Sequence, residues 1–283
     1  MTRLLSISSL AAVLLACGGR VMGQGSGLES AWGQLRANNT RMAPLQPAWM
    51  GPLIQPDSRL TQSLRLSLSN SYTPARTRTL NWGNYHTLGL IAGDRVQINL
   101  MAPPYLQNHA SGMPDGFGDT MAEAKVRIAS GNAGHGNFAL TAMLTRSLPT
   151  GSHQNGAPTG VWYPTLAAGK MWGRFDAQTM LGGSLPAGKI WAQGREIDWN
   201  TTAQARVGTR LWVDLEDNAV FKLGGPLDGT TENFLTPAAF LVLQRKAWKP
   251  THPVFVPGLG MQIATSRAPL YNHSLIAELR VLF

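Results

Sequence analysis

The chain has 283 residues, with 24 Lys and Arg against 15 Asp and Glu, which gives a formal net charge of +9. Only 14% of the residues are charged, against about 25% in an ordinary soluble domain, while 43% are hydrophobic and 31 are glycine. This balance excludes intrinsic disorder and argues against a charged helical bundle. The single cysteine, Cys17, excludes an intramolecular disulfide and a cysteine-based metal site.

Residues 1–23 are typical of an export signal. Arg3 supplies the positive start, and the apolar run from Leu10 to Cys17 is too short to cross a bilayer as a helix. Two processing routes stay open, which are cleavage after Gly23 and lipidation at Cys17. Beyond this segment no apolar run is longer than Ala238 to Leu243, which excludes a helical membrane protein.

Residues 24–59 form an N-terminal extension. The spacing of its apolar residues predicts a short amphipathic helix at 28–37. Pro44, Pro47, Pro52 and Pro56 then prevent long regular structure. Two placements stay open for this extension: a plug inside a barrel lumen, or a periplasmic tail.

From residue 60 onward, apolar and polar residues alternate, as in Leu64, Leu66 and Leu68 against Arg65 and Ser67. Such alternation predicts strands with one apolar and one polar face. We expect twelve strands, at 60–72, 79–92, 95–105, 119–130, 137–148, 161–173, 175–185, 197–214, 218–224, 234–246, 253–266 and 270–283. Several reach the 9–11 residues or so that cross a bilayer. The predicted fold is therefore all-β, a closed antiparallel up-and-down transmembrane barrel over residues 60–283.

Connections between these strands alternate roughly between short and long, as in an outer-membrane barrel with short periplasmic turns and long external loops. The apolar face should then meet lipid, at Leu66, Val126, Leu140, Val207 and Leu279. Tryptophans near the strand ends, among them Trp162, Trp172 and Trp212, fit the aromatic girdles of such barrels.

Two short motifs carry a family resemblance. Gly116-Phe117-Gly118-Asp119 opens a predicted strand, and Pro149-Thr150-Gly151 ends the next one. Residues 95–283, with these motifs, resemble the outer-membrane barrels assigned to the meta-pathway of phenol degradation. The resemblance implies a 12-stranded barrel, linked to uptake of aromatic or other apolar compounds.

The polar face of each strand should point into the lumen and carry an excess of positive charge. The basic residues expected there are Arg65, Lys125, Arg127, Lys170, Arg174, Arg206, Arg210 and Arg280, against Glu123, Asp176, Asp214 and Glu278. Rings of Arg and Lys favour anions in pores. If the lumen conducts, we therefore predict a modest preference for anions, with Arg206 and Arg210 as the foremost contacts. The alternative is that these side chains only fill and brace a lumen that does not conduct.

The last strand ends in Leu279, Val281 and Phe283, which alternate up to the terminal residue. This pattern is typical of the signal that barrel assembly machinery recognises, so we expect that machinery as a partner. Outer-membrane lipid and lipopolysaccharide are the other expected partners, because the net charge is positive and the location is the cell outer membrane. The basic residues are spread singly, so nucleic acid is not expected.

Enzymatic chemistry has little support in the sequence. His109 and Ser111 mimic a base and nucleophile of a barrel lipid hydrolase, but they lie in a loop without a third orienting group. The histidines are isolated, so no metal site and no cofactor are expected. The predicted function is a channel or transporter for small solutes, and the alternatives are a structural barrel with a blocked lumen or a lipid hydrolase.

Overall fold

The structure is a computed structural model that describes residues 27–83, 86–152, 155–244, 253–267 and 269–283. The predicted signal segment and Cys17 lie outside the described residues. The chain divides into two compact units, Met1–Gln34 and Leu35–Phe283. Helix α2 (Gly27–Met42) covers the predicted 28–37 and continues one turn further. None of the described helices is long and apolar enough to cross a membrane.

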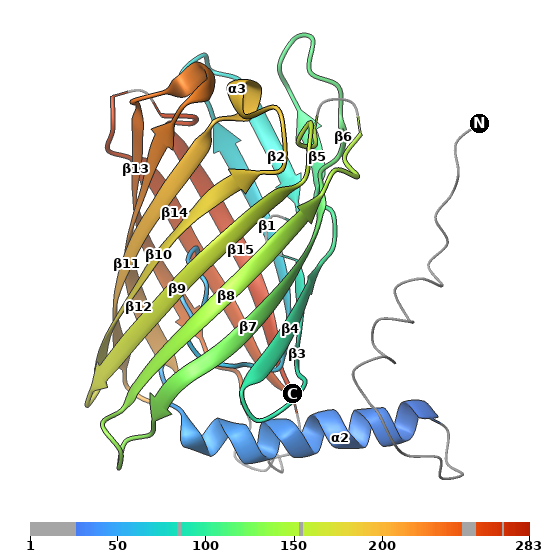
Figure 1. Ribbon diagram of the computed structural model, residues 1–283. Helices are drawn as coiled ribbons and strands as arrows, with labels where there is room; N and C mark the ends of the chain where they lie inside the picture. Colours follow the sequence, from blue (N-terminus) through green and yellow to red (C-terminus); the bar gives the residue numbers. More distant parts are fainter. Residues whose placement is uncertain (1–26, 84–85, 153–154, 245–252, 268) are drawn as a thin grey trace. The chain divides into compact units, whose positions relative to one another are not determined.

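The second unit is a closed antiparallel β-barrel, as predicted (Figure 1). Its strand segments are β1 (Ser63–Tyr72), β2 (Arg78–Trp82), β3 (Thr87–Ile91), β4 (Val96–Met101), β5 (Tyr105–Asn108), β6 (Gly116–Phe117), β7 (Thr120–Gly131), β8 (Phe138–Leu148), β9 (Val161–Trp172), β10 (Phe175–Pro186), β11 (Arg195–Val207), β12 (Leu211–Leu223), β13 (Thr231–Leu241), β14 (Val254–Ala264) and β15 (His273–Leu282). Pairing of β15 with β1 closes the ring. Short helices η1 (Ala43–Leu45), α3 (Ile190–Gln193) and η2 (Gly225–Leu227) lie outside the strands.

The fifteen segments occupy twelve barrel positions, because three positions hold two segments each. β2 and β3 share one position, β4 and β5 the next, and β6 and β7 the third. The breaks have local causes. Gly83 has a φ of +115°, and Pro103 and Pro104 between β4 and β5 offer no backbone N–H for pairing.

One predicted strand boundary is wrong. The range 197–214 is not one strand but the hairpin of β11 and β12, whose turn contains Gly208 with a φ of +66°. The alternation continues through this turn unchanged, so it concealed the reversal. The predicted turn at 216–217 therefore lies in the middle of β12, and residues 218–224 belong to the same strand.

Turn length separates the two ends of the barrel. Tight connections such as Gly173-Arg174 and Gly208 to Arg210 lie at one end, which also holds the start of β1 and the C-terminus (Figure 1). The longer connections, including those with α3 and η2, lie at the other end. We call these the short-turn end and the long-loop end. The predicted alternation of short and long connections holds for most of the barrel. The exceptions are the twelve residues 242–253 between β13 and β14, at the short-turn end, and the five residues 73–77 between β1 and β2, at the long-loop end.

The register of the two faces is also as predicted. Leu66, Val126 and Val207 are exposed on the outer face at 39%, 43% and 50%. Trp162 and Trp172 stand ten residues apart on the outer face of β9, which at a rise of about 3.3 Å and the usual tilt spans about 25 Å, the height of an outer-membrane apolar band. Trp212 is an exception to the predicted girdle, since it is buried on the luminal face.

Candidate functional site

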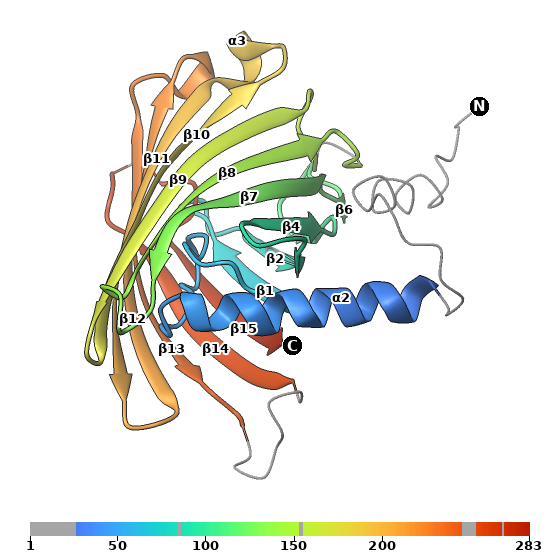
Figure 2. The ribbon, with the colours of Figure 1, turned by 60° about the horizontal axis from the view of Figure 1, so that its bottom comes forward.

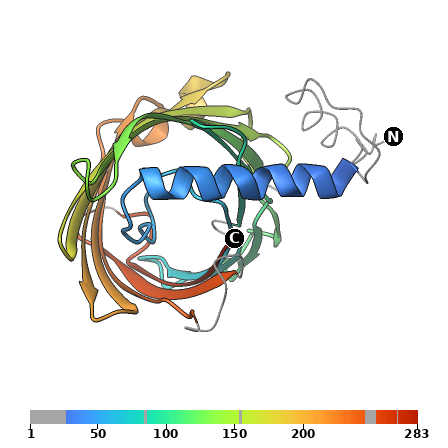
Figure 3. The same cartoon turned by 90° about the horizontal axis from the view of Figure 1, so that it is seen from below.

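The lumen contains a stretch of the chain's own N-terminal extension, residues 43–62, which we call the luminal segment. It follows α2, enters the barrel from the short-turn end, turns inside and returns to that end, where β1 begins (Figure 2). Seen along the barrel from below, it lies within the ring of strands (Figure 3). The candidate site is therefore the lumen wall together with this segment.

Apolar contacts seat the turn of the luminal segment against the wall. Trp49 and Leu53 are 3% and 0% exposed. They belong to one apolar cluster with luminal side chains of the strands, namely Ala139, Met171, Trp212, Phe240, Val256 and Ile276. Burying a Leu or Trp side chain stabilises by roughly 2 kcal/mol or more. A segment broken by prolines can thus be held without regular structure of its own.

Glu216 of β12 holds the backbone of the segment at its turn. Its Oε1 accepts hydrogen bonds from the amides of Leu53 (2.5 Å) and Ile54 (2.9 Å), and its Oε2 accepts one from Gln55 (3.0 Å). Glu216 is fully buried. Three successive amides that converge on one carboxyl group satisfy donors that would otherwise be buried without partners.

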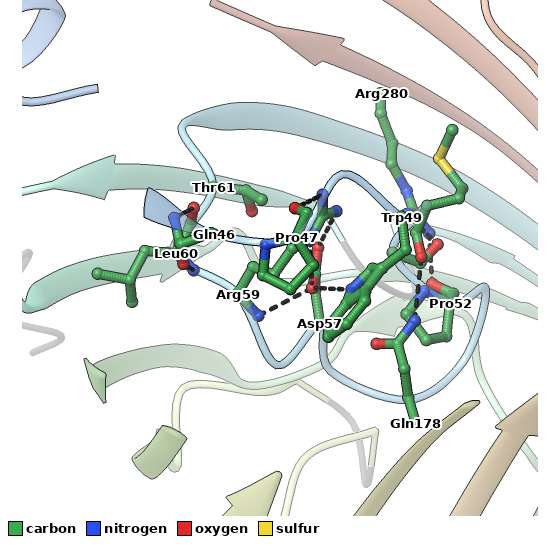
Figure 4. Close-up of polar contacts among 12 residues, drawn as sticks. Gln46, Pro47, Trp49, Pro52, Asp57, Arg59, Leu60, Thr61, Gln178 and Arg280 are labelled. Carbon is green, nitrogen blue, oxygen red and sulfur yellow. Dashed lines mark hydrogen bonds and ion pairs between the residues drawn. The ribbon is translucent and has the colours of Figure 1, made fainter. Parts of the chain in front are cut away.

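Basic side chains hold the carbonyls of the same segment from other strands. Arg280 donates to the carbonyl oxygens of Gly51, at 2.5 Å, and Pro52 (Figure 4). Arg65 donates to the Leu53 carbonyl, and Lys125 Nζ donates to the carbonyl of Asp57 at 2.7 Å. Gln178 of β10 also donates to the Met50 carbonyl, at 3.1 Å, and Gln97 of β4 accepts from the Thr61 amide, at 2.6 Å. The segment is therefore fixed from at least six strands around the barrel.

The returning limb is braced by an internal ion pair. Arg59 Nη2 lies 2.7 Å from Asp57 Oδ2, and Asp57 Oδ1 accepts hydrogen bonds from the Arg59 amide and from Trp49 Nε1 (Figure 4). Burial alone would raise the pKa of Asp57. The charges of Arg59 and Lys125 and the hydrogen bonds from Arg59 outweigh burial, and the pKa falls to about 2. Gln46 links the two limbs by pairing with the amide and the carbonyl of Leu60.

Four of the eight basic residues that were predicted to face the lumen lie there and contact the protein itself. Arg65, Lys125 and Arg280 bind the luminal segment, as described above. The fourth, Arg127, donates to the carbonyl of Asp94 at 2.6 Å and contacts Met42 Sδ. Backbone carbonyls engage part of their donors, and contact with an anion stays a prediction.

The other predicted luminal bases lie elsewhere. Arg206 is exposed at the short-turn rim, over the ring of Trp212 at 5.9 Å. Arg210 is in the β11–β12 turn, and Arg174 is in the β9–β10 turn. Lys170 is exposed on the outer face of β9, where its Nζ donates to the Gly136 carbonyl. The predicted luminal position is therefore wrong for Arg174 and Arg210, which lie in turns, and for Lys170, which is on the outer face. Arg206 keeps the predicted luminal face of β11, at the rim, where it pairs across the hairpin with Trp212.

Sequence reasoning missed Glu216, Asp57 and Arg59. Glu216 was assigned to a turn, although its spacing from Asp214 and Asn218 matches a luminal row. Asp57 and Arg59 lie in a segment without alternation, so no periodicity could assign them a face. The cluster of four prolines was the one signal in the sequence that this stretch forms neither a strand nor a long helix.

The two motifs that carry the family resemblance meet at the long-loop end. Asp119 accepts hydrogen bonds from the amides of Gly151 (2.9 Å) and Ala157 (2.8 Å). The Thr120 amide donates to Thr150 Oγ1 at 2.9 Å. Here Asp119 caps the loop that leads from β8 to β9, so the motif residues have a structural task at the loop end.

Neither the hydrolase pair nor a metal cluster gains geometric support. His109 Nε2 lies 2.8 Å from an Arg78 nitrogen, and Ser111 is exposed in the loop. Within the part of the chain that the structure describes, no hydrogen bond joins His109 to Ser111 and no group of three potential metal ligands occurs. At the C-terminus, Asn39 Nδ2 donates to the Phe283 carbonyl at 2.7 Å, and the assembly role of Phe283, Val281 and Leu279 stays a prediction.

No family model and no curated protein matches the chain. Among solved structures, it is similar to an outer membrane channel from Pseudomonas putida F1, with 13% sequence identity and a TM-score of 0.53 over 83% of this chain and 100% of that chain. It is also similar to the NanC porin, with 7% identity and a TM-score of 0.48 over 77% of this chain and 98% of that chain. The likeness to the Pseudomonas channel shows a shared outer-membrane barrel fold.

Proposed function

We propose that this chain is an outer-membrane channel for small solutes whose lumen is narrowed at the periplasmic side by residues 43–62. The short-turn end is the periplasmic end, by analogy with barrels of this class. The observation that carries the proposal is the seating of the luminal segment, whose backbone is held by side-chain hydrogen bonds from at least six strands. Residues 43–62 enter the lumen from the end assigned to the periplasm. A segment that hydrogen bonds hold in the lumen and that can leave it would act as a gate.

The wall itself supports a conduit. Its luminal face is lined by hydroxyl, amide and charged side chains, whereas its outer face is apolar. A polar interior is the arrangement of barrels that pass water-soluble solutes. The Pseudomonas protein of the same fold is described as a channel, which agrees with this role. We infer no catalytic role, because His109 is engaged by Arg78.

Two finer proposals concern the solute. The motif resemblance favours aromatic or other apolar compounds, and the luminal bases favour anions. A second candidate function, a structural barrel whose lumen stays blocked, is favoured by the density of contacts that hold the luminal segment.

Liposome swelling tests the channel against the blocked barrel. The full chain and a variant that lacks residues 27–55 are reconstituted and exposed to uncharged sugars of increasing size. We expect slow swelling with the full chain and faster, size-limited swelling with the variant. The variant retains Asp57 and Arg59, so their ion pair remains. Absence of swelling in both proteins, with folding verified by heat-modifiable gel migration, would favour the structural barrel.

A further inference from the structure

Charge is distributed unevenly along the lumen. The basic side chains Arg65, Lys125, Arg127 and Arg280 all lie in the half near the short turns, where they bind backbone carbonyls. Toward the long loops, the luminal faces of β9–β13 carry Glu196, Asp198 and Glu232. All residues of these five strands are described, and Lys222 is the only base on their luminal faces in that half.

These four side chains, Glu196, Asp198, Lys222 and Glu232, form what we call the loop-end cluster. Lys222 Nζ lies 2.5 Å from Glu196 Oε1 and 3.8 Å from Glu232 Oε2. Lys222 thus neutralises chiefly Glu196, and three carboxyl groups share one cation. Asp198 is partly exposed, and within the described part of the chain no group donates a hydrogen bond to its carboxyl oxygens. Tyr163 of β9 lies within electrostatic range of Glu196 and Asp198 and adds an aromatic face.

A second observation lies one luminal position below Asp198 on the same strand. The Asn200 side chain is 9% exposed, and its Oδ1 has no hydrogen-bond partner. A buried carboxamide oxygen that accepts no hydrogen bond is energetically unfavourable. It is an acceptor, so a ligand that relieves the cost must bring N–H or O–H donors.

Chemistry selects the class of ligand. Carboxyl groups and a carboxamide oxygen on one luminal face offer acceptors only, apart from the donors of Lys222 that Glu196 already engages. A protonated amine has up to three donors and a positive charge, and it also binds favourably over aromatic faces such as that of Tyr163. A carboxylate or phosphate would meet repulsion here, since the acids outnumber the base.

We propose that the loop-end half of the lumen binds amine-bearing organic cations, with Asp198 as the principal contact and Asn200 as a second acceptor. This inference names a substrate class for the channel proposed above and rests on that proposal for its meaning, although binding itself does not require conduction. It differs from the anionic solute that strand alternation alone suggests, because the luminal bases lie in the other half and hold the luminal segment.

The test is calorimetric titration of the full folded chain in detergent at pH 7.5 with 1,4-diaminobutane, and with succinate as an anion of matched length. We expect binding of the diamine and no measurable binding of succinate. Asp198→Asn removes the charge with little change in side-chain volume, and it should weaken diamine binding at least fivefold. The control is Asp217→Asn, which makes the same chemical change on the outer face of β12 and should leave diamine affinity unchanged.

Three results would overturn the inference: no diamine binding by the wild type, succinate binding of equal strength, or equal diamine affinity in wild type and Asp198→Asn. A second variant, Glu232→Gln, guards against misfolding of the first and should also weaken binding. Diamine binding without solute permeation in liposomes would support this inference and contradict the channel. Solute permeation without diamine binding would support the channel and contradict this inference.

Discussion

Replacing Glu216 by alanine should release the luminal segment. The substitution removes the carboxyl group whose two oxygens accept the amides of Leu53, Ile54 and Gln55. A buried donor left without a partner costs roughly 1–3 kcal/mol. Allowing for incomplete additivity, three such donors should destabilise the seated state by about 3–6 kcal/mol, which shifts the ratio of seated to released segment by about 100-fold to 10,000-fold.

Single-channel recording in planar bilayers measures this shift. Wild-type protein should show low conductance with rare openings, and Glu216→Ala should show frequent or permanent openings. Glu216→Gln keeps an oxygen in the place of Oε1 and loses the acceptor for the Gln55 amide, so its opening frequency should fall between the two. Graded openings would connect the effect to hydrogen-bond acceptors rather than to the loss of side-chain volume.

The matched control is Thr236→Val on neighbouring β13. Thr236 is a fully buried luminal residue whose hydroxyl donates to Asn218 of β12 rather than to the luminal segment. This variant should behave as the wild type. The reasoning is refuted if Glu216→Ala and Thr236→Val have the same opening frequency, or if Glu216→Ala stays closed while melting at a lower temperature.

Three further predictions concern the wall, the terminus and acid. Val126→Arg places a charge in the middle of the lipid face and should lower the free energy of unfolding, measured by refolding into bilayers, by about 2–4 kcal/mol. Val207→Arg lies beside the turn and should lower it by at most about 1 kcal/mol. Equal losses for the two variants would show that the depth or the face of these residues is misassigned. Deleting Phe283 should lower the yield of inserted protein in cells much more than the melting temperature of barrel refolded in detergent; an unchanged yield would remove the assembly signal. Asp57 has a pKa of about 2 in the folded state against an ordinary 3.8, so its stabilisation, about 2 kcal/mol, is complete above pH 3.8 and is lost as the pH falls through 2. Acid should thus raise channel opening in wild type, and Asp57→Asn should open already at neutral pH; a wild-type conductance that is flat between pH 5 and 2 would argue against the ion pair as a brace.

Strand alternation predicted the barrel because each face of the wall meets a different solvent. Lipid on one side and a polar lumen on the other impose a period of two on every strand, and Val126, Lys125 and Gln97 follow it. The same rule cannot locate a tight turn that preserves the period. Gly208 interrupts β11 and β12 without a break in the pattern, and this placed Glu216 in a turn and Arg210 in the lumen.

The contents of the lumen were much less predictable. The luminal segment has no repeat, and its partners come from strands up to 229 residues away in sequence, as for Gly51 and Arg280. Positive charge in the wall indicated a ligand, but a side chain that binds a carbonyl of its own chain has the same residue type as one that binds a solute. Only the three-dimensional arrangement separates these roles.

The central claim is that the seated luminal segment closes the channel, and a reversible lock tests it within one molecule. Leu53 is fully buried beside β14, where a side chain at Gly260 would meet it, so the pair Leu53→Cys and Gly260→Cys can cross-link segment and wall once Cys17, the one native cysteine, is replaced by Ser. The measurement is planar-bilayer conductance of the cross-linked protein before and after addition of a reductant. The predicted result is that the cross-linked protein lacks even the rare openings of the wild type and that openings return on reduction. Conductance that is unchanged on reduction, with cleavage of the cross-link verified by mass spectrometry, would contradict the claim.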